Sequence, residues 1–295
     1  MKKDKRIKLN IFTFAIGIFL FIYTISMCFA LVWALINSLK TMLDFKFHPF
    51  DLPQQYKFDN YVKVFNFVKI QVIEVGVGSR YVYIAEMFLN SILYTVGVTF
   101  CSVMSACCVA YASAKYKKYA FMRLLYSIAI VVMILPIVGA LPAQINISQT
   151  FGFYDNIVGA WFMKASCFGT NFLVLYASYS NVSWEYAEAA FIDGASHFKV
   201  FTRIMIPLVK TSIYSMMLLS FISNWNDYYF PMIFLPSMPT AAYGLFKFQS
   251  STSGAASSIP VQLAACVFLA LPIFVLFVVF KEKLIGNISI GGLKG

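Results

Sequence analysis

The groups in this chain that could do chemistry gather in one short stretch, residues 185–208, within an otherwise apolar sequence. Three carboxylates, one imidazole and two cations lie there, namely Glu185, Glu188, Asp193, His197, Lys199 and Arg203. The only other histidine, His48, is distant in the chain, so a histidine-based metal pair is not indicated. The sequence also lacks H-E-x-x-H, Gly-x-Ser-x-Gly and the phosphate-binding pattern G-x-x-x-x-G-K-S/T. The stretch is therefore expected to be a contact surface, without catalytic residues or a metal site.

A second polar cluster interrupts a later apolar run and consists of Trp225, Asn226, Asp227 and Tyr228. Aromatic rings can stack on the C–H face of a sugar, and amide and carboxylate groups can pair with its hydroxyls. An ionisable group such as Asp227 is costly within an apolar span and usually faces protein or water there. Two interpretations stay open, a lining of a substrate path and a hydrogen-bonded clasp between spans.

The composition indicates that a membrane is the solvent of this chain. Of its 295 residues, 60% are hydrophobic and 12% are charged, whereas about a quarter are charged in soluble domains. The net charge of +11 comes from short basic clusters between apolar runs, which is typical of membrane loops and not of a nucleic-acid-binding face. The six cysteines form no Cys-x-x-Cys pair, so neither a disulfide framework nor a zinc site is indicated.

The apolar runs predict an all-α membrane protein, with residues 1–295 forming a single transmembrane domain. A helix needs about 20 apolar residues to cross a bilayer. Six runs approach or exceed this length, at about 11–39, 87–114, 124–144, 165–182, 211–235 and 261–280. The first run is longer than the apolar core of a signal peptide, so we expect it to be retained as a span.

The segments between these spans differ in polarity. Residues 40–86 form the one long polar segment and are expected to be an external loop, in which Gln71 to Ile84 alternates and predicts a hairpin or short strands. Small residues in the second span, including Gly97, should let helices approach closely. Pro136 and Pro142 in the third span free backbone carbonyls, which protein or water must satisfy.

The basic residues predict the orientation. Six spans place both termini and the 185–208 stretch on one side, and that side carries 15 of the 23 Lys and Arg residues. Because positive charge near span ends favours the cytoplasmic side, both termini and this stretch are expected to be cytoplasmic.

The local sequence of the stretch predicts two short helices joined at Gly194. Ser183 and Glu185 suit a helix start, because a hydroxyl can cap the free N–H groups there and a carboxylate is favoured at the positive end of the helix dipole. Gly194 can adopt the left-handed conformation that ends a helix. Ser196 can cap the second helix, and Pro207 should kink or end it.

Its motif resembles a known family. Glu188-Ala189-Ala190, then Gly194, then Ile204-Met205-Ile206-Pro207 is similar to the EAA loop of ABC importer permeases. The fuller form, residues 188–196, resembles the maltose-type carbohydrate uptake permeases, a group of binding-protein-dependent inner membrane components. Agreement over most of the chain comes from Asn60-Tyr61, Asn90-Ser91, Trp225-Asn226-Asp227 and Gly291 to Gly295. The chain departs from the family at Ile206, where leucine is usual, and in the long segment before Asn90.

This resemblance implies that the stretch is a cytoplasmic coupling helix between spans four and five. It would enter a groove on an ATPase subunit and transmit closure of the ATPase pair to the spans. The residues implied in coupling are Glu185, Glu188, Ala189, Ala190, Asp193, Gly194, Ala195 and Pro207. The alternative from the residues alone is an amphipathic helix lying on lipid.

The resemblance also implies a set of partners in a bacterial plasma membrane. These are a second, homologous permease, two ATPase subunits that use ATP and Mg, and an extracytoplasmic solute-binding protein. The chain itself would bind no cofactor and no nucleic acid, and the substrate would be an oligosaccharide or related glycan. The alternative from another class is a membrane-embedded transferase, which needs catalytic residues clustered at one membrane face. Only residues 185–208 could supply them, and they lack a plausible catalytic set.

Overall fold

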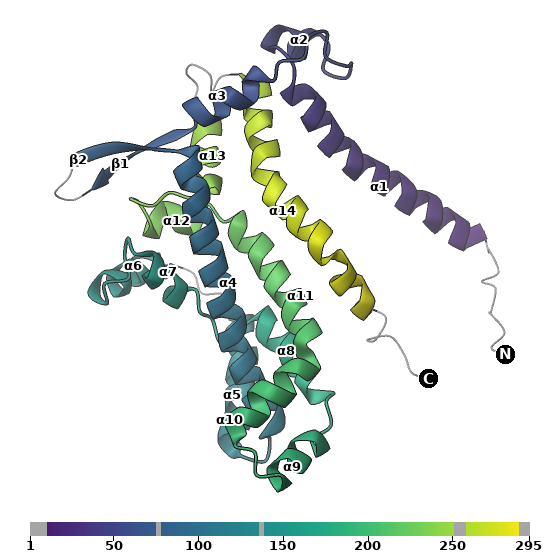
Figure 1. The fold of residues 1–295 in the computed structure, drawn as a ribbon, viewed down its shortest axis with the longest axis vertical. Helices are drawn as coiled ribbons and strands as arrows, with labels where there is room; N and C mark the ends of the chain where they lie inside the picture. The colour runs from purple at the N-terminus through teal and green to yellow at the C-terminus, as the bar shows by residue number, and fades with distance from the viewer. Residues whose placement is uncertain (1–10, 75–77, 136–138, 251–257, 289–295) are drawn as a thin grey trace. The chain divides into compact units, whose positions relative to one another are not determined.

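A computed structural model describes residues 11–74, 78–135, 139–250 and 258–288. The chain divides into two compact units. The first comprises Met1–Val68 and Phe248–Ala270, and the second comprises Lys69–Lys247 and Leu271–Gly295. Figure 1 labels the helices and strands of both units.

The first unit contains α1 (Ile11–Ser38), α2 (Met42–Phe47) and α3 (Asp59–Phe67). The side chain of Asn60 donates to the carbonyls of Ser38 and Lys40, each at 2.8 Å, and so joins the start of α3 to the end of α1. The sequence did not predict α2 and α3, since six and nine residues are too few for a clear helical period. Local capping stabilises α2, where the Thr41 hydroxyl accepts from the Asp44 backbone N–H at 3.1 Å.

The second unit begins with a two-stranded antiparallel hairpin, β1 (Lys69–Glu74) and β2 (Gly78–Tyr83). Ile70 pairs with Val82 in the register, and both side chains are buried. Lys69 and Tyr81 lie on the exposed face, and the Lys69 ammonium lies 4.5 Å from the Tyr81 ring centroid. The alternating stretch therefore forms the predicted hairpin.

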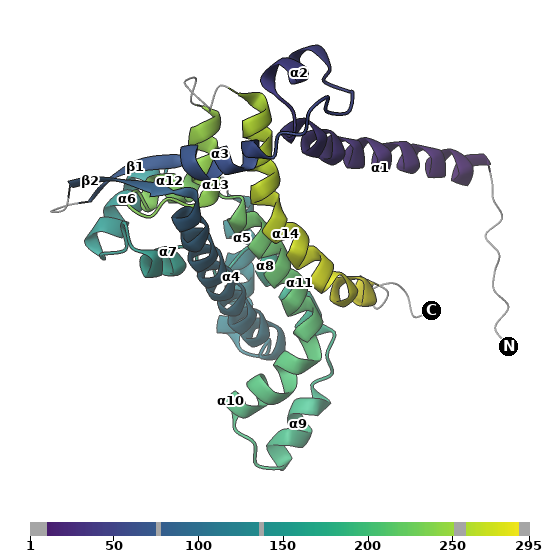
Figure 2. The same cartoon turned by 45° about the horizontal axis from the view of Figure 1, so that its top comes forward.

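Helix α4 (Ile84–Lys115) is the central helix of this unit, and it packs against α8 (Thr170–Ser180) and α11 (Ile206–Trp225). The three helices run close together in both views of the chain (Figures 1 and 2). Small buried residues of α4 allow the close approach, among them Ala106, Cys107 and Ala110. They meet large buried side chains of the two neighbours, including Phe172, Leu175, Tyr179, Val209, Ile213 and Met216.

Gly97 has a specific packing role on α4. A Cβ atom at this position would lie 2.0 Å from the indole ring of Trp161 in α7 (Ile157–Met163). The indole N–H donates to the Leu93 carbonyl at 3.1 Å, which fixes the ring against the helix. The small residue expected to permit close packing is therefore required where α7 crosses α4.

Four helices are long and apolar enough to cross a membrane: Phe12–Ser38, Ile84–Lys115, His197–Trp225 and Ile259–Val279. They contain the second predicted span, overlap almost all of the first and sixth, and include residues 211–225 of the fifth. The last of them belongs to α14 (Ile259–Ile288). The count of six spans stays a prediction.

The predicted third span, 124–144, is wrong as a single helix. Helix α5 (Ala120–Ile134) ends at Leu135, whose extended backbone (ψ 118°) is expected for a residue that precedes a proline. Helix α6 (Leu141–Thr150) begins after Gly139, which has a φ of +76°, and carries Pro142 in its first turn. Pro136 lies outside the described residues. The hydropathy of the run concealed a break that backbone geometry imposes.

The predicted bounds of the fourth and fifth spans also need correction. The fourth, 165–182, contains only the 11 residues of α8, because Gly169 precedes it with a φ of +125°. The fifth, 211–235, begins earlier, at His197, and its helical run ends at Trp225. After residues 226–228 come α12 (Tyr229–Phe234) and α13 (Ala241–Gln249).

Pro207 does not end the helix in which it lies. Helix α10 (His197–Val200) continues through a π-helical turn, η1 (Phe201–Met205), into α11. A proline lacks an N–H and its ring crowds the carbonyl four residues earlier, here Arg203. The π turn includes Arg203 and changes the hydrogen-bond pattern just before the proline, so the helix continues.

Candidate functional site

The 185–208 stretch has the predicted local structure. Helix α9 (Glu185–Ile192) is followed by Gly194 with a φ of +78° and then by α10. The Ala195 N–H donates to the Ala190 carbonyl at 2.9 Å across this turn, which satisfies the end of α9. The Ser196 hydroxyl accepts from the Lys199 N–H at 3.4 Å, as predicted for a cap. At the other end the cap residue is Trp184, and the Ser183 hydroxyl accepts from the Glu185 N–H at 3.3 Å.

One face of α9 packs on other elements of the second unit, and the opposite face is open. Ala187 and Ala190 are buried, and their spacing of three places them on one side of the helix. Five of the predicted coupling residues are exposed, namely Glu185, Glu188, Ala189, Asp193 and Gly194. Ala195 is half-buried. Pro207 is also exposed, at the start of α11. Ala187 and Ala190 therefore lie on the packed side, and the carboxylates lie on the open side.

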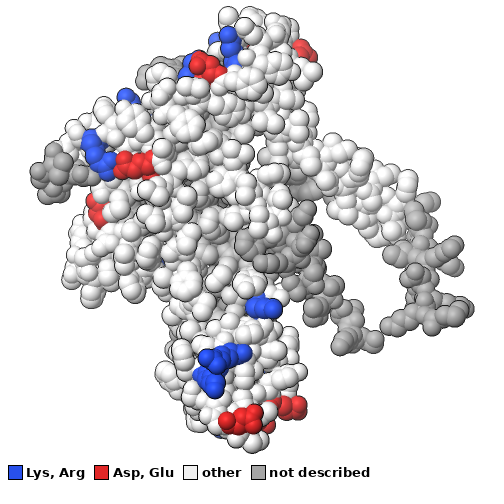
Figure 3. All heavy atoms as spheres, in the orientation of Figure 1, with Lys and Arg blue, Asp and Glu red and all other residues white. Residues whose placement is uncertain are grey.

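Two large apolar side chains, which the sequence reasoning missed, lie on this open surface. Ile192 is 86% exposed and Phe198 is 75% exposed. Exposed apolar groups rimmed by charges are typical of a surface that contacts another protein or a membrane. In Figure 3, red atoms lie at the lower tip, where Figure 1 labels α9, and blue atoms lie above them. For Phe198 the signal was available, because it lies between His197 and Lys199; Ile192 ends the apolar run 189–192 and gave no such signal.

The second candidate site is built around Asp227, between α11 and α12. Its Oδ2 atom lies 2.8 Å from the Lys164 ammonium and accepts from the Tyr94 hydroxyl at 3.2 Å. Its Oδ1 atom accepts from the Phe230 backbone N–H at 3.1 Å, which satisfies the start of α12. The Lys164 ammonium also lies 4.7 Å from the Phe230 ring centroid. These four residues, Tyr94, Lys164, Asp227 and Phe230, are called the Asp227 site below.

The Asp227 site joins elements that are far apart in the chain. Tyr94 belongs to α4, and Lys164 follows α7. The side chains of Lys164 and Asp227 are 30% and 18% exposed, which makes this the most buried ion pair recorded in the described part of the chain. The sequence reasoning missed Lys164. It could have been found, because it is the only Lys or Arg between Arg123 and Lys199.

The four residues predicted for a substrate path have different surroundings. Trp225 is 2% exposed, with its ring edge-on to Phe88 at 5.7 Å and stacked with Phe221 at 5.8 Å. Asn226 is exposed, and its side chain donates to the Ile222 carbonyl. Tyr228 is 39% exposed and stacks on Phe246 with ring centroids 4.4 Å apart. Of the four, only Asn226 and Tyr228 are open to the surroundings in this conformation.

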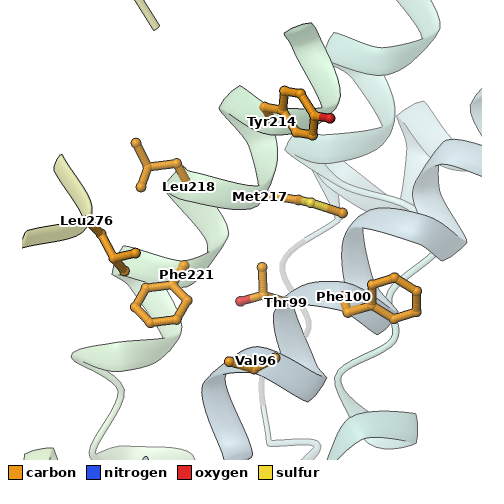
Figure 4. A pocket seen from close by; sticks show the side chains of 8 residues that line it. All are labelled: Val96, Thr99, Phe100, Tyr214, Met217, Leu218, Phe221 and Leu276. Carbon is orange, nitrogen blue, oxygen red and sulfur yellow. The ribbon is translucent and has the colours of Figure 1, made fainter. Parts of the chain in front are cut away.

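The second unit also holds an apolar pocket of about 300 Å³. It lies between α4, α11 and α14, as Figure 4 shows, and is lined by Val96, Thr99, Phe100, Tyr214, Met217, Leu218, Phe221 and Leu276. None of these side chains is charged, so the pocket differs in chemistry from the Asp227 site. Within the described residues no group of three or more His, Cys, Asp or Glu could hold a metal ion.

The comparison with protein families identifies the class of this chain. Residues 102–285 match the family described as "binding-protein-dependent transport system inner membrane component". The match covers more than half of the chain, and the chain belongs to this family, in agreement with the resemblance of its 188–196 motif. Both candidate sites apart from Tyr94 lie within the matched residues.

Individual relatives cover almost the whole chain. It is 27% identical to the probable ABC transporter permease protein YurM of Bacillus subtilis, over 99% of this chain and 93% of that protein. It is 24% identical to the arabinooligosaccharides transport system permease protein AraQ of the same organism, over 97% of each. It is 22% identical to the diacetylchitobiose uptake system permease protein NgcG of Streptomyces coelicolor, over 92% of this chain and 86% of that protein.

A solved structure has the same fold. A chain of a bacterial ABC transporter involved in the import of the acidic polysaccharide alginate superposes with a TM-score of 0.77. The match covers 92% of this chain and 96% of that chain, with 22% sequence identity.

Proposed function

We propose that this chain is a transmembrane permease subunit of an ATP-driven ABC importer whose substrate is a carbohydrate, an oligosaccharide or related glycan. The family match over residues 102–285 carries the proposal. The substrate class is supported by relatives named for the transport or uptake of arabinooligosaccharides and diacetylchitobiose. The chain contributes no ATPase site of its own, and partner subunits use ATP and Mg.

In this proposal α9 is the coupling helix. Its exposed residues Glu185, Glu188 and Ala189 face a groove of an ATPase subunit. Gly194 provides the turn that orients α9 toward this groove. Closure of the ATPase pair moves α9. Because α8 precedes α9 directly and α10, η1 and α11 follow it, the movement reaches two helices that pack on α4. Alternating access of the substrate cavity follows from that movement.

The complete transporter in this proposal contains a second, homologous permease, two ATPase subunits and an extracytoplasmic solute-binding protein. The chain lies in the bacterial plasma membrane as a multi-pass protein, with α9 and both termini cytoplasmic. The distribution of Lys and Arg along the sequence supports this orientation.

Within the Trp225–Tyr228 cluster we assign different roles to different residues. Trp225 and Asp227 form a clasp, because their side chains are largely buried and contact partners from other elements. Asn226 and Tyr228 face the substrate path, because they are the exposed members of the cluster.

Reconstitution of the complete transporter tests the proposed function. Proteoliposomes with both permeases and the ATPase should accumulate glycans when binding protein and ATP are added, and mass spectrometry identifies the sugars retained. Omission of this chain should abolish accumulation. A glycan that becomes covalently joined to lipid or protein without crossing the membrane would instead support the transferase alternative.

A further inference from the structure

Four rings form a cycle of contacts that includes both ends of α9, and each ring belongs to a residue at the end of a helix. Tyr116 is the residue that ends α4, and Trp184 caps the start of α9. Phe191 lies in the last turn of α9, and His197 begins α10. We call these four residues the aromatic box.

Each ring of the aromatic box contacts two others. The centroids of Tyr116 and Trp184 are 5.5 Å apart, and those of Trp184 and Phe191 are 6.0 Å apart. His197 closes the cycle, with centroids at 4.7 Å from Phe191 and 6.1 Å from Tyr116. The Tyr116 hydroxyl and His197 Nδ1 also share a hydrogen bond of 2.9 Å. Both ends of α9 are therefore joined to one residue at the end of α4.

The network continues from the aromatic box into the helices of the second unit. Tyr111, five residues before Tyr116, lies edge-on to it with ring centroids 5.9 Å apart. The Tyr111 ring contacts Phe201 of η1 at 4.8 Å and Tyr179 of α8 at 5.4 Å. The Lys115 ammonium donates to the Val182 carbonyl in the short link between α8 and α9. Tyr116 is thus the residue through which α9 and α10 contact the end of α4, and Tyr111 is the residue through which η1 and α8 contact it.

We propose that Tyr116 is a positioning residue that makes α9 and the end of α4 move as one body, so that displacement of the coupling helix reaches α4 directly. This proposal rests on the proposed coupling role of α9. Without the box, α9 would stay connected through its chain links to α8 and α10 and through the packing of Ala187 and Ala190. Each link then absorbs part of the displacement by local rearrangement, since coupling depends on contiguous packed groups.

The test uses the complete transporter in proteoliposomes and compares Tyr116→Ala with Tyr116→Phe. For Tyr116→Ala we expect glycan uptake per ATP hydrolysed to fall about tenfold, the factor that corresponds to losing about two ring contacts. Tyr116→Phe keeps the ring and removes the hydroxyl, so its ratio should stay near that of the unchanged protein. Tyr126→Ala is the matched control, because Tyr126 stacks on Tyr176 at 4.5 Å between α5 and α8, away from the box.

A second measurement distinguishes a loss of movement transmitted from α9 to α4 from a loss of folding or assembly. In a cysteine-free background, a cysteine at position 189 should still crosslink to the ATPase groove in the Tyr116→Ala protein, and ATP hydrolysis should continue. An unchanged ratio, an equal loss in Tyr116→Phe, or disappearance of the crosslink together with hydrolysis would each overturn the proposal. Absence of the crosslink in a protein with Tyr116 intact would instead contradict the coupling role of α9 itself.

Discussion

The charged groups of the α9 surface and of the Asp227 site differ in exposure and in pairing. The carboxylates Glu185, Glu188 and Asp193 are exposed, and no ion pair of theirs is recorded within the described residues. Asp227, in contrast, is largely buried and satisfied by a cation, a hydroxyl and a backbone N–H. Unpaired exposed charges are available to a partner, whereas buried charges with complete partners hold elements together. Substitutions should therefore affect function at α9 and stability at the Asp227 site.

The largest effect is expected at Trp225, next to the Asp227 site. Trp225→Ala removes a side chain that is 2% exposed, so the cost should be about 3–5 kcal/mol of stability. Thermal unfolding of the solubilised complex measures the loss. Tyr229→Ala is the control, because Tyr229 is 54% exposed and its removal leaves no comparable cavity. If Trp225→Ala leaves the melting temperature unchanged and weakens only glycan uptake, Trp225 belongs to the substrate path.

The Lys164–Asp227 ion pair should give the next largest effect. Lys164→Met leaves the Asp227 carboxylate without its cation in a mostly buried position, which should cost about 2 kcal/mol after allowance for partial exposure. The double variant Lys164→Met with Asp227→Leu removes both charges and should recover part of the loss. Lys210→Met provides an exposed-lysine control. Equal melting temperatures for Lys164→Met and Lys210→Met would contradict a clasp at this site.

At the α9 surface, Gly194→Val should impair coupling more than stability. A β-branched residue resists the φ of +78° observed there, although a Cβ atom would meet no other group within 4 Å. The strain should misdirect α9 and lower uptake per ATP hydrolysed about tenfold or more, which corresponds to about 1.4 kcal/mol. Gly194→Asn is the control, since asparagine tolerates this conformation. Full transport by Gly194→Val at normal expression would contradict the proposed role of the turn.

Tyr228 offers the smallest expected effect and separates substrate contact from the clasp. Tyr228→Ala removes an exposed ring that could stack on a sugar, so the glycan concentration for half-maximal uptake should rise about fivefold, or about 1 kcal/mol. The melting temperature should change little, in contrast to Trp225→Ala. Unchanged uptake with lowered stability would assign Tyr228 to packing on Phe246.

The sequence predicted local features well where a residue type determines backbone geometry. Gly194 and Ser196 ended one helix and began the next as their chemistry requires, and alternation identified the β1–β2 hairpin. Hydropathy was less informative, because it indicates whether a segment prefers a membrane or water and does not indicate where its helices begin and end. It therefore joined α5 to α6 across Gly139 and extended the fifth span past Trp225.

Contacts between distant segments could not be predicted in this way. Asp227 was recognised as unusual, but its partners Tyr94 and Lys164 lie 133 and 63 residues away in the chain. The rings of the aromatic box are likewise ordinary aromatic residues in the sequence, and only the fold brings them into one cycle. The family match does not assign roles to these residues either, so variants such as those above are needed to test their roles.

A crosslinking measurement addresses the proposed role of α9 most directly. Ala189 is exposed on α9, between the buried Ala187 and Ala190. A cysteine at position 189, in a complex without native cysteines in this chain, should crosslink to a cysteine in the ATPase groove, and ATP should change the yield. If position 189 instead reacts only with lipid-soluble reagents and gives no crosslink in any nucleotide state, α9 lies on the membrane and is not the coupling helix.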